Sequence, residues 1–76
     1  MTFLRTPKDI IDTLERLVNE YPNYMINLIM SPKGFTYKSR IVGERYDGSC
    51  IEFTQYDPDR EMMYLLDLPV YHRKEG

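Results

Sequence analysis

The residues best suited to catalysis are Cys50 and His72, the only cysteine and the only histidine in the chain. A thiol beside an imidazole can act as a nucleophile with its base. The sequence offers no evident third group to orient the imidazole, and a cysteine is more often a small buried apolar residue. Asp57 and Asp59 look like paired carboxylates, but they flank Pro58, where aspartates commonly accept hydrogen bonds from the turn backbone. We therefore predict no enzyme, no metal ion and no cofactor.

The residues best suited to binding are Arg45 and Tyr46, which stand directly before an Asp47-Gly48 turn signal. An exposed aromatic ring beside a cation at a loop tip can stack on single-stranded bases, although the same pair is also common in ordinary hairpins. Lys38 and Arg40 lie upstream and are candidate phosphate contacts. The candidate RNA-binding residues are Lys38, Arg40, Arg45, Tyr46 and Asp47.

Charge is unevenly distributed along the chain, although the net charge is only −2. Residues 33–45 carry four basic side chains and one acidic one, whereas residues 52–67 carry five acidic side chains and one basic one. A slightly negative chain is not a strongly electrostatic nucleic-acid binder. The two segments are either solvated faces or complementary edges between subunits.

A single helix is predicted over residues 7–20. Thr6 is a good N-cap, Pro7 suits the first helical position, and Tyr21-Pro22 ends the pattern. One apolar stripe repeats with helical spacing and should cover a face of the sheet. Its members are Ile10, Ile11, Leu14, Leu17 and Val18.

Five short strands should follow the helix, separated by turn residues. Their predicted ranges are 24–31, 35–45, 49–56, 61–66 and 70–73. Ser39 and Gly43 are small residues within the second run, as a sharply bent strand requires. A capped helix followed by five strands predicts a mainly β fold, a strongly bent five-stranded antiparallel barrel, with an open α+β sheet as the alternative.

Length limits what this fold can bury. Seventy-six residues allow one domain, 1–76, which is marginal as a monomer. One cysteine allows no internal disulfide, so oligomerisation is the expected source of extra buried area. The run 62–66 is apolar on both faces, and an uncovered apolar strand is a liability. The candidate subunit interface is Met62, Met63, Tyr64, Leu65, Leu66, Val70 and Tyr71. No long apolar run or signal peptide is evident, so we expect a soluble cytoplasmic protein.

Three segments resemble the motifs of Sm-like (Sm, LSm and Hfq-type) proteins. Residues 33–41 resemble the glycine-led turn and bent strand of their first motif, and residues 46–53 resemble its aspartate loop and following strand. Residues 62–70 resemble the second motif, in which an apolar strand turns into a short final one. The sequence departs from the family at Ser39, which replaces a second glycine, and after residue 64, where the family's RNA-binding pair is missing. Of the family's RNA-binding positions, only the loop with Tyr46 and Asp47 has a counterpart in this sequence.

The resemblance implies an SH3-like (Sm-like) barrel that assembles into a homo-oligomeric ring of five to eight copies and binds single-stranded RNA without catalysis. In that family the fourth and fifth strands of neighbouring barrels pair edge to edge. The alternative is a protein–protein interaction module on a small SH3-like barrel, which docks a protein through its acidic surface and binds no RNA. The RNA-binding ring is the preferred interpretation.

Overall fold

The computed structural model describes residues 1–30 and 39–73. Helix α1 (Pro7–Glu20) has the predicted bounds, and its start is held by a reciprocal cap. The Asp9 amide donates to Thr6 Oγ1 (3.2 Å), while the amides of Arg5 (2.9 Å) and Thr6 (3.0 Å) donate to Asp9 Oδ2. These backbone donors hold the pKa of Asp9 below its usual value.

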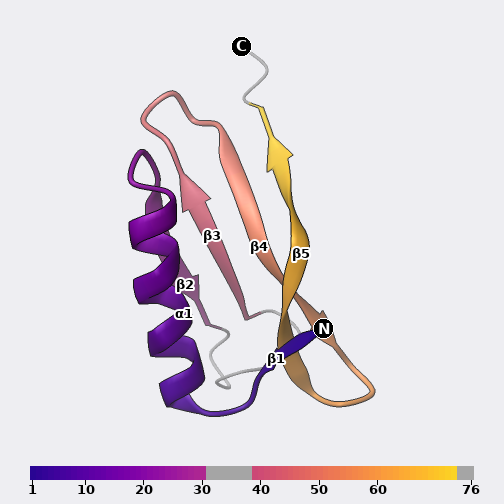
Figure 1. Cartoon of the computed structure of the whole chain (residues 1–76). Coiled ribbons are helices and arrows are strands. Elements are labelled where there is room, and N and C mark those ends of the chain that lie inside the picture. The colour runs from indigo at the N-terminus through magenta and orange to yellow at the C-terminus, as the bar shows by residue number, and fades with distance from the viewer. Residues whose placement is uncertain (31–38, 74–76) are drawn as a thin grey trace.

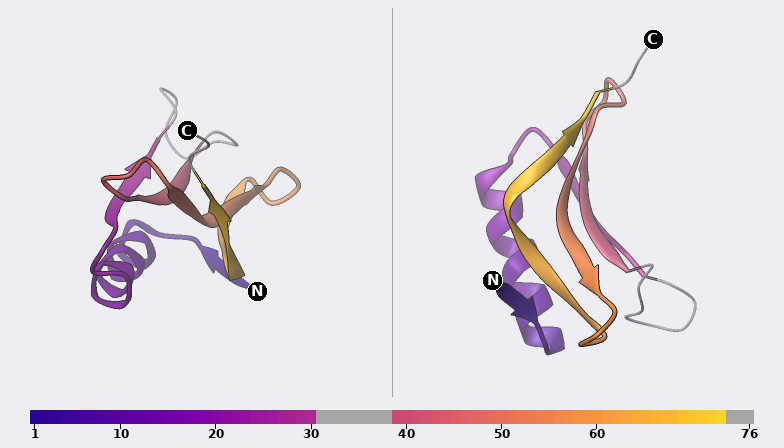
Figure 2. Two further views of the ribbon diagram at one scale, coloured as in Figure 1. Left: turned by 90° about the horizontal axis from the view of Figure 1, so that it is seen from above. Right: turned by 90° about the vertical axis from the view of Figure 1, so that its right-hand side faces the viewer.

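The strands form one antiparallel sheet in the order β1-β5-β4-β3-β2. The sheet curls into a half-barrel, and α1 lies against its concave face (Figures 1 and 2). The predicted class, a mainly β fold with an N-terminal helix and a bent antiparallel sheet, is therefore confirmed. In the described residues the end strands β1 and β2 are not paired, so the sheet stays open.

Three predicted strands are present with altered ends. The strand predicted over residues 24–31 is β2 (Met25–Ile29), and the one predicted over 49–56 is β4 (Cys50–Asp57). The strand predicted over 35–45 is β3 (Arg40–Glu44), and residues 35–38 lie outside the described residues. Ser39, Ile41 and Gly43 are all buried and face the same side of the sheet.

An additional strand, β1 (Thr2–Leu4), precedes the helix and was not predicted. It pairs with the middle of the apolar run, placing Leu4 opposite Met63, Phe3 opposite Tyr64 and Thr2 opposite Leu65. The backbone edge at Met63, Tyr64 and Leu65 is therefore paired within the chain, and the subunit interface stays a prediction.

The last two predicted strands, 61–66 and 70–73, form a single strand β5 (Met62–His72). Its pairing with β4 is nevertheless interrupted. Leu65 lies opposite Thr54 and Val70 opposite Glu52, so four residues of β5 face Phe53 alone. Pro69 falls in this bulge, where its missing N–H costs no ladder hydrogen bond. The proline therefore interrupts the pairing without ending the strand.

The core lies between α1 and the concave face. Of the residues that the structure describes, seven apolar side chains are buried there: Leu4, Ile10, Leu17, Ile41, Ile51, Phe53 and Met63. Thr54 is also buried, and its hydroxyl accepts a hydrogen bond from the Ile41 amide (2.8 Å), so this polar group is satisfied. Two members of the predicted helical stripe are not buried, since Ile11 is 61% and Val18 54% exposed.

Candidate nucleic-acid interface

The β3–β4 hairpin holds the predicted aromatic residue at its tip. Gly48 adopts φ 87°, and its amide donates to the Arg45 carbonyl (3.0 Å). The Asp47 carboxylate accepts from the Ser49 amide (2.9 Å) and the Ser49 hydroxyl (2.6 Å). Tyr46 is 97% exposed, so its ring projects from a turn that is fixed on both sides.

The Arg45 guanidinium lies over an aromatic ring, and its charge also helps to lower the pKa of the Asp47 carboxylate. Its Cζ is 5.6 Å from the centroid of the Tyr24 ring, within the range of a cation–π contact. Its Nε is buried and has no hydrogen-bond partner, and no ion pair forms with it among the described residues. A guanidinium held in this way keeps donors available for an anionic group.

Gly43 makes this packing possible. A Cβ at this position would lie 2.8 Å from Ile51 Cγ2, 3.0 Å from Phe53 Cε2 and 3.2 Å from Tyr24 Cβ. The closest of these contacts is with Ile51, so a side chain here would disturb the core first and press on Tyr24 as well.

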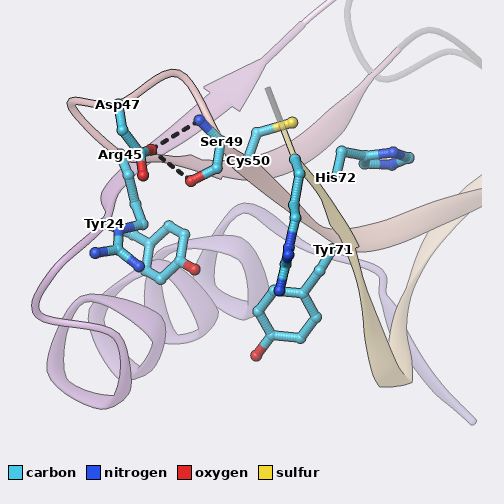
Figure 3. A pocket seen from close by; sticks show the side chains of 8 residues that line it. Tyr24, Arg45, Asp47, Ser49, Cys50, Tyr71 and His72 are labelled. Atoms are coloured by element: carbon cyan, nitrogen blue, oxygen red, sulfur yellow. Dashed lines mark hydrogen bonds between the residues drawn. The ribbon is translucent and has the colours of Figure 1, made fainter. Parts of the chain in front are cut away.

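A pocket of about 550 Å³ opens at this end of the sheet, where the hairpin, the α1–β2 connection and the end of β5 meet (Figure 3). Tyr24 and Arg45 lie on one side of it, and Tyr71 lies on the other. Its lining residues are Tyr24, Arg45, Asp47, Ser49, Cys50, Tyr71, His72 and Arg73. Aromatic rings and arginines together suit a ligand with flat bases and a charged backbone.

An aromatic cluster joins the pocket to the core. The Tyr21 ring lies 4.9 Å from that of Phe53 and 6.2 Å from that of Tyr24, measured between centroids. Burial raises the pKa of Tyr21, and the neighbouring Tyr71 raises it further through charge and a side-chain hydrogen bond. The Tyr71 side chain therefore lies near Tyr21, at the end of the helix.

The structure brings together only some of the predicted RNA-binding residues. Arg45 and Tyr46 are adjacent at the hairpin end, whereas Arg40 pairs with Ile29 at the opposite end of β3. Asp47 lines the pocket, but its hydrogen bonds to Ser49 give it a role in the turn and lower its pKa. Lys38 lies outside the described residues.

Sequence reasoning did not assign Tyr24, Tyr71 and Arg73 to this site. Tyr71 was expected at a subunit interface, and the other two were not assigned a role. The antiparallel return of the last strand is the signal that could have found them, because it places Tyr71 opposite Ile51, close to the hairpin. Using this signal requires the register between β4 and β5. The bulge at Pro69 shifts that register, so it cannot be read from the sequence.

Cys50 and His72 are cross-strand partners, and the structure adds a group that the sequence did not reveal. His72 Nε2 lies 3.5 Å from Glu52 Oε1, with side chains 50% and 41% exposed. Water reaches both side chains, and the ladder alone explains the proximity of the three residues. Among the described residues, no cluster of histidine, cysteine and acidic side chains could hold a metal ion.

Comparisons with protein-family models, with curated proteins and with solved structures found no match. Within the described part of the chain, no helix has the length and apolar character needed to cross a bilayer. The geometry of the hairpin end is therefore the feature of the molecule that indicates a function.

Proposed function

We propose that this protein binds single-stranded RNA at the hairpin end, as a homo-oligomer and without catalysis. The observation that carries the proposal is the arrangement of Tyr46 beside Arg45, whose guanidinium stacks on Tyr24 and forms no hydrogen-bonded ion pair with a carboxylate in the described residues. The exposed ring would stack on a base, and Arg45 and Arg73 would contact phosphates.

The architecture supports this reading in a second way. Tyr46 is almost fully exposed, so packing does not explain an aromatic side chain at the tip. Tyr24 and Tyr71 line the adjacent pocket, which offers further stacking surfaces behind it. Stacking is tolerant of sequence because every base has a π-face, so short U-rich and A-rich strands should both bind.

Fluorescence anisotropy with labelled U-rich and A-rich single strands tests this function. The wild-type protein should bind at low salt, with affinity that falls as salt rises. Tyr46→Ala should lose about tenfold or more in affinity, since stacking contributes substantially per base. Tyr46→Phe is the matched control, because it keeps the ring and should keep the affinity. An absence of binding at low salt, or equal losses in both variants, would overturn the proposal.

A protein-docking module is the second candidate, and one observation favours it. The end of β5 exposes apolar side chains, with Leu68 85%, Val70 44% and Tyr71 61% exposed. If the chain is such a module, a pull-down should recover a partner protein, and nuclease treatment should not reduce the amount recovered. Recovery of RNA that is lost after nuclease treatment would instead favour the first candidate.

A further inference from the structure

Tyr24 and Arg45 form a wall between two pockets at the hairpin end. The pocket of about 550 Å³ described above, here called the β5-side pocket, lies between this pair and Tyr71 (Figure 3). A second pocket of about 540 Å³, the β2-side pocket, lies where β2 begins beside the hairpin tip, and its lining includes Met25 and Tyr46. Of the described residues, only Tyr24 and Arg45 line both pockets. Because Arg45 Cζ lies 5.6 Å from the Tyr24 ring centroid, the two side chains form one partition.

Each pocket has an aromatic ring of its own in addition to the shared wall. Tyr71 lines only the β5-side pocket and is 61% exposed, and Tyr46 lines only the β2-side pocket and is 97% exposed. Both volumes fall in the range of about 300–1,000 Å³ that is typical of small-ligand sites. Each pocket can therefore take one base with its sugar, and each offers a ring on which that base can stack.

The charged side chains differ between the two pockets. The β5-side pocket has Arg73 in addition to Arg45, and its one carboxylate, Asp47, already accepts two hydrogen bonds from Ser49. The β2-side pocket has the Glu44 carboxylate in addition to Arg45. A phosphate would be repelled by Glu44 and attracted by the two arginines. The favourable path for a phosphate chain therefore runs from Arg45, at the wall, toward Arg73.

Rings and cations alternate along this path in the order Tyr46, Arg45, Tyr71 and Arg73. Bases and phosphates alternate in the same way along a nucleic-acid strand. Proteins that bind single strands commonly splay neighbouring bases apart and stack each of them on an aromatic ring or a guanidinium plane. A wall between two pockets requires this, because two bases that stay stacked on each other cannot lie on opposite sides of it.

We propose that the hairpin end binds two successive nucleotides of one strand, with one base in each pocket and the phosphate that joins them on Arg45. This inference rests on the proposed RNA-binding function and specifies the unit that is bound, an unstacked dinucleotide step. A mononucleotide fills only one of the pockets. A duplex keeps its bases stacked and paired, so it fills neither.

Short fluorescent RNA strands of equal length test this inference. They carry uracil at one position, at two adjacent positions, or at two positions separated by one abasic sugar. All have the same phosphates, so differences in affinity report the bases alone. In anisotropy titrations at low salt, the adjacent pair should bind about tenfold more tightly than the single uracil, because a second base stacks. The separated pair should bind nearly as weakly as the single uracil, since the two pockets share one wall.

Two variants each remove the ring of one pocket. In Tyr71→Ala and in Tyr46→Ala, the adjacent pair should lose most of its advantage over the single uracil, because only one pocket still stacks a base. Tyr56→Ala is the matched control, since this tyrosine lines neither pocket, and there the advantage should stay about tenfold. Tyr46 and Tyr71 are exposed, so both variants should fold, and circular dichroism checks all three.

The outcomes separate this inference from the proposed function. If the adjacent pair binds no more tightly than the single uracil, or keeps its advantage in Tyr71→Ala, the two-pocket inference is overturned. Binding that still weakens with salt and with Tyr46→Ala would in that case leave the proposed function standing. If none of the strands binds at low salt, the proposed function is overturned together with the inference.

Discussion

The two ends of the sheet each carry a turn with an aspartate and an arginine, but they use the arginine differently. In the β4–β5 turn, Arg60 donates to Asp57 Oδ2 (2.7 Å), so its charge is compensated within the turn. In the β3–β4 turn, Asp47 is engaged by Ser49, and Arg45 stacks on Tyr24 without an ion pair in the described residues. Both arginines lie over an aromatic ring, since Arg60 Cζ is 5.4 Å from the Phe3 ring centroid, and Arg45 also lowers the pKa of Asp47 through its charge. The difference is the direct hydrogen-bonded ion pair, which only the β4–β5 turn has among the described residues.

We expect the largest effect at Gly43, on which both the stability and the RNA affinity of the hairpin end should depend. Gly43→Ala places a methyl group against Ile51, Phe53 and Tyr24, and overpacking of this kind typically costs about 1–3 kcal/mol of unfolding free energy. RNA affinity should fall as well, because Tyr24 supports Arg45. Urea unfolding and anisotropy measure the two effects. Val42→Ala, on the other face of β3, should lower stability alone; unchanged affinity in Gly43→Ala would contradict the account.

Removing the arginine charge at each end in turn tests whether the two turns differ in RNA binding. Arg45→Gln should reduce RNA affinity about tenfold and make binding less sensitive to salt, because a phosphate contact is lost. Arg60→Gln should leave affinity unchanged and lower the melting temperature, since it breaks a partly exposed ion pair and a contact with the Phe3 ring. Anisotropy over a series of salt concentrations and thermal unfolding provide the readouts. Equal losses of affinity in the two variants would mean that net charge, rather than position, governs binding.

Backbone strain should also distinguish the two turns. Glu61 has φ 52°, whereas the corresponding left-handed position of the hairpin is occupied by Gly48. Glu61→Gly should relieve strain worth up to about 1 kcal/mol, partly offset by a more flexible unfolded chain. Gly48→Ala should lose about 1 kcal/mol, because its φ of 87° disfavours a side chain. Urea midpoints should therefore shift in opposite directions; shifts of the same sign would contradict the assignment of strain.

Lowering the pH should destabilise both turns to a similar extent, and this is the smallest of the predicted effects. The Ser49 hydroxyl lowers the pKa of Asp47, and the Arg60 guanidinium lowers that of Asp57. A carboxyl group with a lower pKa in the folded state binds fewer protons there than when unfolded. Its stabilisation is therefore present above the ordinary aspartate range and lost as pH falls through the folded pKa. Asp57→Asn and Asp47→Asn should each flatten the acid limb of a melting-temperature profile, and a steeper limb would refute this.

Local signals predicted the parts of the fold that local interactions determine. Thr6-Pro7 and Tyr21-Pro22 bracket α1 correctly, and Asp47-Gly48 marks the hairpin, because caps and tight turns depend on neighbouring residues. β1 has only three residues and exists because a distant strand pairs with it. Periodicity likewise identified the apolar stripe of α1, but it could not show that the sheet leaves Ile11 and Val18 uncovered.

The site was predictable to a similar extent. Arg45 and Tyr46 are recognisable from their place beside the turn, whereas Tyr24 and Arg73 reach the pocket through the packing of the α1–β2 connection and the return of β5. Gly43 was assigned to strand bending, and its close approach to Ile51, Phe53 and Tyr24 appears only in three dimensions. Contacts between distant segments therefore account for most of what the sequence did not show.

The most direct test of the central claim is to map where RNA binds, by titrating a short single strand into isotope-labelled protein and following the amide resonances. We predict that changes concentrate at residues 44–50 and 71–73, with little change at residues 57–62 in the opposite turn. Changes centred on the opposite turn, or no changes at low salt, would contradict the account.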